Sequence, residues 1–274
     1  MVDSFIASLA ISIDVKRPGH YLKPGPRGEA VAALGMVLSY LSDFVNNRSN
    51  KQAGHMPEVI FAGPEGRLEG RYHPQKDRDA PIAIVLHPHP NYGGTMNNKV
   101  VYNLHYAFYN LGFTVMRFNF RGVGRSQGEY DLGIGELSDA ASALDYLQSM
   151  NQNAKHCWVA GFSFGAWIGM QLLMRRPEIT GFISVAPPAN LYDFSFLAPC
   201  PASGLIINGT ADKVAPPKDT VSLVNKLHEQ KGITVTHSLI EGADHFFKDE
   251  ELHMKPMIDT VSTYVKRRLS EVTR

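Results

Sequence analysis

A serine between two glycines is the first residue in this sequence that could carry chemistry. Residues 161–165 read Gly-Phe-Ser-Phe-Gly, directly after an apolar run at Cys157–Ala160 and directly before a helical pattern over Ala166–Arg175. A serine at the tip of a tight strand-to-helix turn has a strained backbone and close neighbours, and flanking glycines avoid the collisions. The pattern predicts that Ser163 presents its hydroxyl above one edge of a sheet, as a nucleophile.

A serine hydroxyl is a poor nucleophile unless a base removes its proton, and that base needs a carboxylate to orient it. Both residue types follow later apolar runs. Asp212 lies in a loop after Leu205–Ile207, and His245 lies in a loop after Thr234–Ile240. Because parallel strands end at the same sheet edge, the three side chains are expected to meet there. We predict Ser163 as the nucleophile, Asp212 as the acid and His245 as the base.

Nucleophilic attack on an acyl group also needs N–H donors for the oxyanion that forms. The backbone N–H of Phe164, at the amino end of the following helix, is one candidate. The loop after Ile82–Leu86 begins His-Pro-His-Pro, and proline has no N–H to donate. We therefore expect the second donor to be the backbone N–H of His89, with Asn91 or Tyr92 as alternatives.

The elements that must position these residues follow an alternating pattern. Short runs rich in Val, Ile and Phe alternate with helical stripes, such as the one formed by Leu137, Ala140, Ala141, Leu144 and Leu147. This alternation is typical of an α/β fold with a mostly parallel central sheet and helices on both faces. The region 59–72, with glycines and a proline in its middle, predicts an antiparallel N-terminal hairpin leading into that sheet.

The length of 274 residues suits one large domain, and 44% hydrophobic with 19% charged residues is typical of a globular chain. Residues 1–55 differ in pattern and are interpreted as an N-terminal appendage, with the main α/β domain expected over 56–274. Two interpretations of the appendage stay open. Met56 could be the natural start, or the segment could add a helix that packs on the domain.

The formal net charge of +1, with scattered Lys and Arg residues, argues against a nucleic-acid partner. No run reaches the roughly 20 apolar residues that a membrane span needs, so no membrane partner is expected. The two cysteines, Cys157 and Cys200, are too few for a disulfide framework and favour a cytoplasmic location.

Two further patterns resemble parts of cofactor sites. His87 and His89 alternate as metal ligands can, but no cysteine or carboxylate cluster accompanies them, so a role in loop structure is expected and no metal. The glycines at 122, 124 and 128 lack the full dinucleotide fingerprint and predict a sharp turn. The nearby arginines are expected to pair with local acids such as Glu129 and Asp131, with recognition of an anionic substrate as the alternative. No cofactor is predicted.

Three segments carry a resemblance to a known family: 87–96, 117–126 and 161–165. Through them the sequence resembles the α/β-hydrolase superfamily over nearly all of residues 57–270. Within the superfamily it is similar to the small bacterial dienelactone-hydrolase-like branch, although dienelactone hydrolases have a cysteine where this chain has Ser163. The resemblance implies the α/β-hydrolase fold and gives Ser163, Asp212 and His245 the same three roles.

The candidate residues also predict a reaction and a pocket. We expect a serine hydrolase that cleaves carboxylic ester or thioester bonds of a small-molecule acyl substrate through an acyl-enzyme on Ser163. A short-peptide peptidase and a catalytically silent binding protein are the alternatives. Only residues 186–203 separate two strands where relatives insert a cap, so no large cap is expected. The substrate pocket is predicted to include Tyr92, Tyr192, Phe194 and Phe196, and a homo-oligomer could help to shape it.

Overall fold

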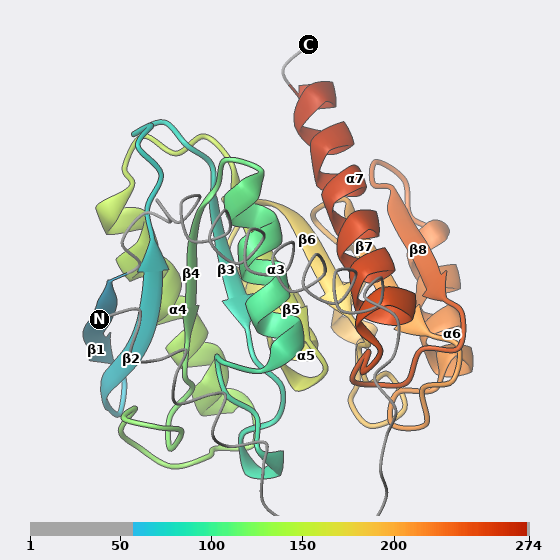
Figure 1. Ribbon diagram of the computed structural model, residues 1–274, viewed down its shortest axis with the longest axis horizontal. Helices are drawn as coiled ribbons and strands as arrows, with labels where there is room; N and C mark the ends of the chain where they lie inside the picture. Colours follow the sequence, from blue (N-terminus) through green and yellow to red (C-terminus); the bar gives the residue numbers. More distant parts are fainter. Residues whose placement is uncertain (1–56, 273–274) are drawn as a thin grey trace, which may run out of the picture. The chain divides into compact units, whose positions relative to one another are not determined.

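The computed structural model describes residues 57–272, which form an α/β fold around a single eight-stranded sheet (Figure 1). The strand order is β1-β2-β4-β3-β5-β6-β7-β8. From β4 to β8 each neighbouring pair is parallel, whereas β2 pairs antiparallel with both β1 and β4. The predicted mostly parallel sheet with an antiparallel N-terminal hairpin is confirmed. The strands are β1 Glu58–Gly63, β2 Gly66–His73, β3 Ile82–Leu86, β4 Thr114–Phe118, β5 Cys157–Phe162, β6 Ile179–Val185, β7 Gly204–Gly209 and β8 Val235–Ile240.

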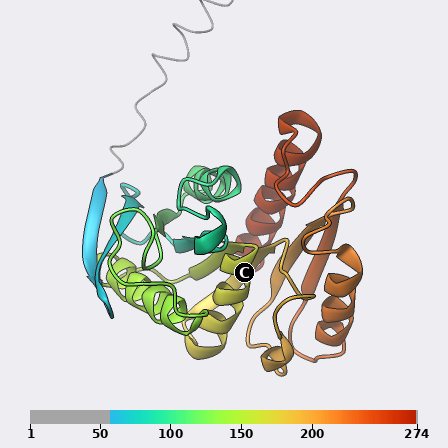
Figure 2. The ribbon, with the colours of Figure 1, turned by 90° about the horizontal axis from the view of Figure 1, so that it is seen from below.

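Helices cover both faces of this sheet. Figure 2 shows α4, α5 and α6 on one face and α3 and α7 on the other, and each group contributes to its own hydrophobic core. The α-helices are α3 Lys99–Asn110, α4 Ile134–Met150, α5 Phe164–Arg175, α6 Pro217–His228 and α7 Lys255–Val272. Three short helical turns add η1 Pro90–Tyr92, η2 Ser195–Leu197 and η3 Glu250–Met254, the last a π-helical turn that leads into α7.

The central strand β3 shows why this sequence forms a sheet buried on both sides. All five of its residues are buried. Ile82, Ile84 and Leu86 face the core under α4 and α5, while Ala83 and Val85 face the core under α3 and α7. Successive side chains of a strand point to opposite faces, so a strand covered on both faces is a continuous apolar run. This central position places the loop after β3 beside the end of β5.

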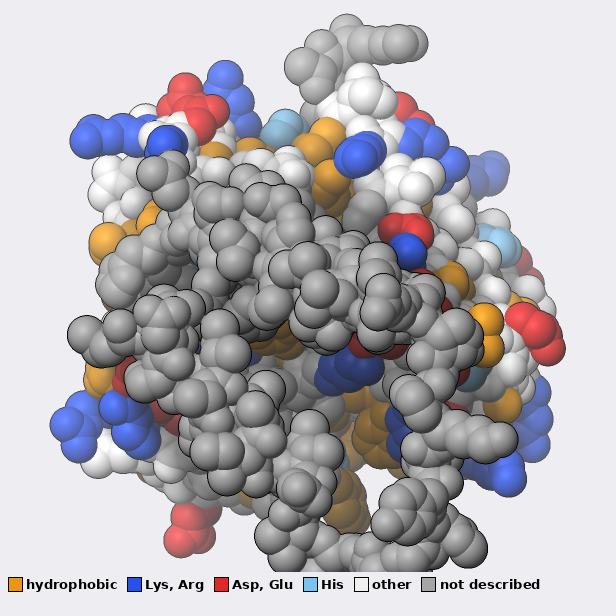
Figure 3. All heavy atoms as spheres, viewed as in Figure 1, with side chains coloured by type: hydrophobic (Ala, Val, Ile, Leu, Met, Phe, Trp, Pro, Cys, Tyr) orange, Lys and Arg blue, Asp and Glu red, His pale blue; other side chains and the backbone are white. Residues whose placement is uncertain are grey.

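The link between β6 and β7 spans residues 186–203 and contains only η2, so the expectation that no large cap is inserted there is confirmed. The proposed appendage, 1–55, and its boundary lie outside the described residues. Of the helices that the structure describes, none is long and apolar enough to cross a membrane. On the visible described surface, Lys and Arg side chains lie among Asp and Glu side chains (Figure 3).

Candidate active site

Three side chains predicted from the sequence form a row of hydrogen bonds at the carboxyl edge of the sheet. His245 Nε2 lies 3.0 Å from Ser163 Oγ, and His245 Nδ1 lies 2.8 Å from Asp212 Oδ2. A carboxylate only accepts hydrogen bonds. His245 Nδ1 therefore carries its proton toward Asp212, which leaves Nε2 free to accept the proton of the Ser163 hydroxyl. All three residues are buried, at 4–8% exposure.

Ser163 lies in a strained turn between β5 and α5. Its backbone has φ 55° and ψ −120°, a conformation that non-glycine residues rarely adopt. The flanking glycines permit it, because a Cβ at Gly161 would collide with the carbonyl oxygen of Gly165. A Cβ at Gly165 would in turn collide with the carbonyl oxygens of Leu86 and His87. The turn therefore depends on glycine at both positions, and it holds the hydroxyl over the sheet edge.

The loop after β7 fixes the carboxylate. Asp212 Oδ1 accepts hydrogen bonds from the backbone N–H groups of Val214 and Ala215, both at 2.8 Å. The second oxygen, Oδ2, remains for His245. The His245 ring packs against Phe162, with ring centroids 5.1 Å apart. Asp212 and the His245 ring are thus both held by groups that do not take part in the proton transfer.

Two backbone N–H groups are suited to bind an oxyanion. Among the described residues, the N–H of Phe164 and that of His89 have no hydrogen-bond acceptor. The alternatives from the same loop are occupied, since the Asn91 N–H donates to His89 Nδ1 and the Tyr92 N–H donates to the His89 carbonyl. The side chains of His89 and Phe164 pack together, with ring centroids 4.9 Å apart. The geometry favours His89 over the alternatives as the second donor.

His87 has a structural contact pattern. Its Nε2 accepts a hydrogen bond from the Phe120 N–H at 3.0 Å, so Nδ1 carries the proton and donates to the Pro88 carbonyl at 2.6 Å. Full burial lowers the pKa of His87 to about 4. The neutral side chain therefore links the loop that carries His89 to the segment directly after β4. Within residues 57–272, no group of three or more His, Cys, Asp or Glu side chains is arranged to hold a metal ion.

Aromatic side chains surround the two candidate N–H donors. Four of them pack on the rings of His89 or Phe164 or on one another, and we call these four residues the aromatic wall. Tyr92 and Tyr130 lie 4.6 and 4.8 Å from the His89 ring, and Trp167 stacks on Tyr192 at 4.3 Å. Burial raises the pKa of Tyr192 to about 12, so its hydroxyl is neutral. The aromatic wall consists of Tyr92, Tyr130, Trp167 and Tyr192.

The predicted pocket residues therefore divide into two groups. Tyr92 and Tyr192 belong to the aromatic wall. Phe194 and Phe196 instead pack against each other at 6.0 Å. Phe194 also lines a cavity of about 340 Å³ against α6, to which Tyr192 contributes as well. The sequence reasoning missed Tyr130 and Trp167. The position of Trp167 four residues after Ser163, one helical turn along α5, was the available signal.

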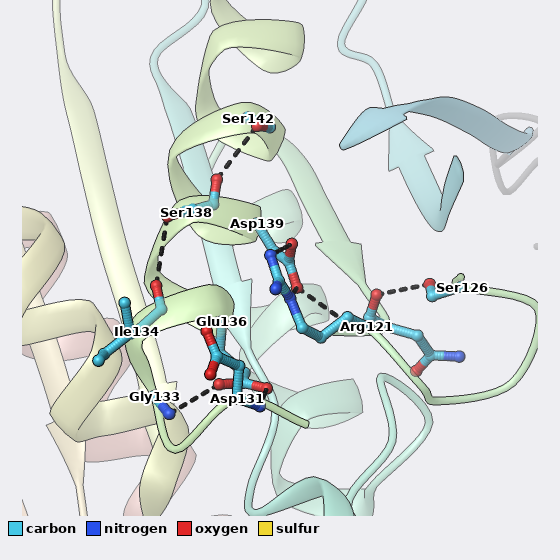
Figure 4. Close-up of polar contacts among 10 residues, drawn as sticks. Arg121, Ser126, Asp131, Gly133, Ile134, Glu136, Ser138, Asp139 and Ser142 are labelled. Carbon is cyan, nitrogen blue, oxygen red and sulfur yellow. Dashed lines mark hydrogen bonds and ion pairs between the residues drawn. The ribbon is translucent and has the colours of Figure 1, made fainter. Parts of the chain in front are cut away.

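The arginines after β4 have structural partners, but not the acids that the sequence suggested. Arg121 forms a buried bidentate pair with Asp139 of α4, at 2.8 and 3.0 Å (Figure 4). Arg125 pairs with Glu58 and Glu69 of the N-terminal hairpin. The expectation that Glu129 and Asp131 are the partners was wrong, because α4 and the hairpin return to this loop and supply carboxylates that lie farther away in the sequence.

Arg117 is also held within the fold. It donates to the Met96 carbonyl and, at 2.8 Å, to Asn97 Oδ1. Its guanidinium lies 5.1 Å from the centroid of the Tyr102 ring. Arg117, Arg121 and Arg125 therefore each hold a loop next to β4 in place.

A mostly parallel eight-stranded sheet, a strained serine turn after β5, and a Ser-His-Asp row at its carboxyl edge define the α/β serine hydrolase fold. The comparisons with known proteins agree, and the chain belongs to the α/β-hydrolase superfamily. Residues 70–200 match the family model of the X-Pro dipeptidyl-peptidases, S15 family.

Three similar proteins illustrate the relationship. An uncharacterized protein of Rickettsia prowazekii is 55% identical over 197 residues, which cover 70% of this chain and 83% of that protein. The crystal structure of an Agrobacterium tumefaciens protein of unknown function, assigned to the α/β hydrolases, is 65% identical with a TM-score of 0.76, covering 78% of this chain and 97% of that one. A Xanthomonas campestris α/β serine hydrolase without a lid is 32% identical with a TM-score of 0.69, covering 78% and 95%.

Proposed function

We propose that this chain cleaves carboxylic ester or thioester bonds through an acyl-enzyme on Ser163. The observation that carries the proposal is the unbroken row from Asp212 through His245 to Ser163, with bond lengths of 2.8 and 3.0 Å. General-base catalysis requires distances of this size between nucleophile and base. Two backbone N–H groups without acceptors among the described residues, on Phe164 directly after the serine and on His89, support the same chemistry.

The reaction follows from these positions. As Ser163 Oγ attacks the acyl carbon, its proton moves to His245 Nε2, and Asp212 stabilises the resulting imidazolium. The N–H groups of Phe164 and His89 hold the oxyanion. His245 then gives the proton to the departing alcohol or thiol. Water attacks the acyl-enzyme by the same route and releases the carboxylic acid.

Peptidase activity is the second candidate, because the X-Pro dipeptidyl-peptidase family model matches residues 70–200. That match includes Ser163 but ends before Asp212 and His245. A peptidase that binds the amino end of its substrate needs carboxylates for the ammonium group. Glu136, near the aromatic wall, already accepts the backbone N–H groups of Asp131 and Gly133. This occupied carboxylate supports the ester over the peptide.

The test combines active-site labelling with turnover. We expect a fluorophosphonate probe to add once to the wild-type chain and not to Ser163→Ala. Hydrolysis of p-nitrophenyl esters should fall by roughly 10³-fold or more in the variant. Ser184→Ala is the matched control, since Ser184 is buried on the neighbouring strand β6 and its hydroxyl has no partner among the described residues.

Two results would contradict the proposal. An absent adduct together with absent ester turnover would indicate a silent binding protein. Faster turnover of Xaa-Pro p-nitroanilides than of the esters would indicate a peptidase.

A further inference from the structure

Six exposed apolar side chains follow the strands that end around the candidate active site. Each loop at the carboxyl edge that borders the triad presents at least one, with exposures from 43% to 86%. They follow β3, β4, β6, β7 and β8 in turn. We call this set the apolar rim, and it consists of Tyr92, Leu132, Ile134, Leu191, Val214 and Phe246.

Contacts connect the apolar rim to the site. Gly133, between two rim residues, packs against the Trp167 ring, and Trp167 stacks on Tyr192. The Asn190 side chain donates to the Val214 carbonyl at 3.0 Å, which joins the loops after β6 and β7. On the other side of the triad, Phe246 packs on the ring of His245, with centroids 5.2 Å apart. The apolar rim therefore continues the aromatic wall outward from Ser163.

Leu132, one of the rim residues, has a backbone conformation that is unfavourable for leucine. Leu132 has φ 52° and is 73% exposed. Left-handed backbone is unfavourable for leucine, and an exposed side chain offers no compensating burial. The buried Glu136 carboxylate holds this conformation by accepting the N–H groups on both sides, from Asp131 at 3.0 Å and Gly133 at 2.7 Å (Figure 4). The fold thus supports an apolar side chain that contributes nothing to the core.

Charges beside the apolar rim do not select a charged substrate. Asp131 precedes Leu132, and Lys213 precedes Val214. Both are exposed and their signs oppose. Lys248, which lies 5.7 Å from the centroid of the Phe246 ring, is likewise paired with an acid, Asp244, at 3.2 Å. The charges beside the rim therefore do not favour a charged substrate.

We propose that the apolar rim and the aromatic wall bind the acyl chain of a medium- or long-chain uncharged ester. This inference rests on the proposed hydrolysis at Ser163 and specifies its substrate class. The acyl carbon lies at Ser163 Oγ, the first part of the chain packs on the aromatic wall, and the remainder covers rim residues such as Leu132. The bound species is a single ester molecule, because the rim is continuous with the reacting position.

The experiment compares p-nitrophenyl acetate with p-nitrophenyl decanoate, each below the concentration at which the decanoate aggregates. The test variant is Leu132→Asn/Ile134→Ser/Leu191→Ser. Asparagine tolerates left-handed backbone, so the loop keeps its conformation. The matched control is Met150→Gln, which changes an exposed side chain at the other end of the helix that begins with Ile134.

We expect kcat/KM for the decanoate to fall at least about tenfold in the triple variant, in line with the loss of one buried aliphatic side chain's worth of contact. The acetate should change by less than about twofold, and Met150→Gln should change neither substrate. Equal values for both esters in the wild type, or an unchanged decanoate value in the triple variant, would overturn the inference while acetate turnover still supports the proposed function.

Two other outcomes are separable. A preference for decanoate that appears only above its aggregation concentration would show that the rim docks on a lipid surface, which overturns the single-molecule inference. No turnover of either ester by the wild-type chain would instead contradict the proposed function itself.

Discussion

His87 couples the candidate active site to the stability of the fold. It is fully buried and links the segment directly after β4 to the loop that carries His89, through one accepted and one donated hydrogen bond. Its burial lowers its pKa from 6.5 to about 4. Between these values the unfolded chain takes up a proton at this position and the folded chain does not. The free energy of unfolding must therefore fall as the pH drops through this window.

This argument predicts the pH dependence of a variant. The contribution of His87 is fully present above pH 6.5, and its loss amounts to about 3 kcal/mol by pH 4. In His87→Gln the side chain does not titrate. The free energy of unfolding at pH 7 should be lower than in the wild type, but its further decrease between pH 6.5 and pH 4 should be smaller by about 3 kcal/mol. Urea unfolding at a series of pH values measures both slopes. Parallel slopes would show that His87 titrates normally in the folded chain.

The polar residues of the site could be predicted from the sequence, whereas half of the aromatic wall could not. Ser163, Asp212 and His245 were predicted because each follows a strand-like run and has a type that acyl chemistry requires. Tyr130 and Trp167 carry no such local signal. An aromatic residue on a helix or loop is usually part of a core, and only the fold shows that these two meet beside His89 and Tyr192.

At the scale of elements, the start of α4 anchors the long loop after β4. Asp139 accepts both the side chain and the backbone N–H of Arg121, and Glu136 accepts two backbone N–H groups before the helix. Arg121 and Asp139 have side-chain exposures of 5% and 0%. The same helix thus fixes Tyr130, which belongs to the aromatic wall, and Leu132, which belongs to the apolar rim.

Removing one partner of this buried ion pair should be costly. In Asp139→Ala the Arg121 guanidinium stays buried without its carboxylate, so we expect the free energy of unfolding to fall by about 3–5 kcal/mol. Glu271→Ala removes the partner of two surface arginines on α7, the exposed Arg267 and the partly buried Arg268, and should cost less than about 1 kcal/mol. Denaturant titrations of both variants measure the difference. Equal, small effects would show that water or another acid replaces Asp139.

The partners of these arginines also show where sequence reasoning fails for elements. Acids close in the sequence were the natural expectation, since local pairs need no knowledge of the fold. Arg125 instead reaches Glu58 and Glu69, because β2 pairs antiparallel with β4 and brings the hairpin beside the loop. The elements themselves were predicted from hydrophobic periodicity. Their spatial order, with β4 between β2 and β3, has no comparable local signature.

At the scale of the whole molecule, the site is divided between the centre and the edge of the sheet. Ser163 follows the central strand β5, and His89 follows its neighbour β3. His245 follows β8, whose one strand partner within residues 57–272 is β7. Cys157, on β5, is buried, and burial raises the pKa of its thiol to about 12. The central strand β5 therefore leads directly into the nucleophile, and labelling of its buried thiol shows when this strand becomes exposed.

This division predicts two transitions in urea. With Cys200→Ser as the background, Cys157 is the sole thiol, and Ellman's reagent should label it slowly until the sheet opens. Ester turnover should decline at lower urea, because opening of the edge strand β8 displaces His245 before β5 is exposed. Labelling and turnover measured on the same samples test the order. Coincident curves would mean that the sheet opens as one unit.

The link between β6 and β7 has a consequence for how such a scaffold can change over time. Residues 187–203 lie outside the strand ladders, and Asn190 and Leu191 within the link are exposed. The entropic cost of a longer loop grows only with the logarithm of its length. An inserted segment could therefore enlarge this link without altering strand register. Evolution could add a cover here, or exchange one, while the nucleophile and its partners stay fixed.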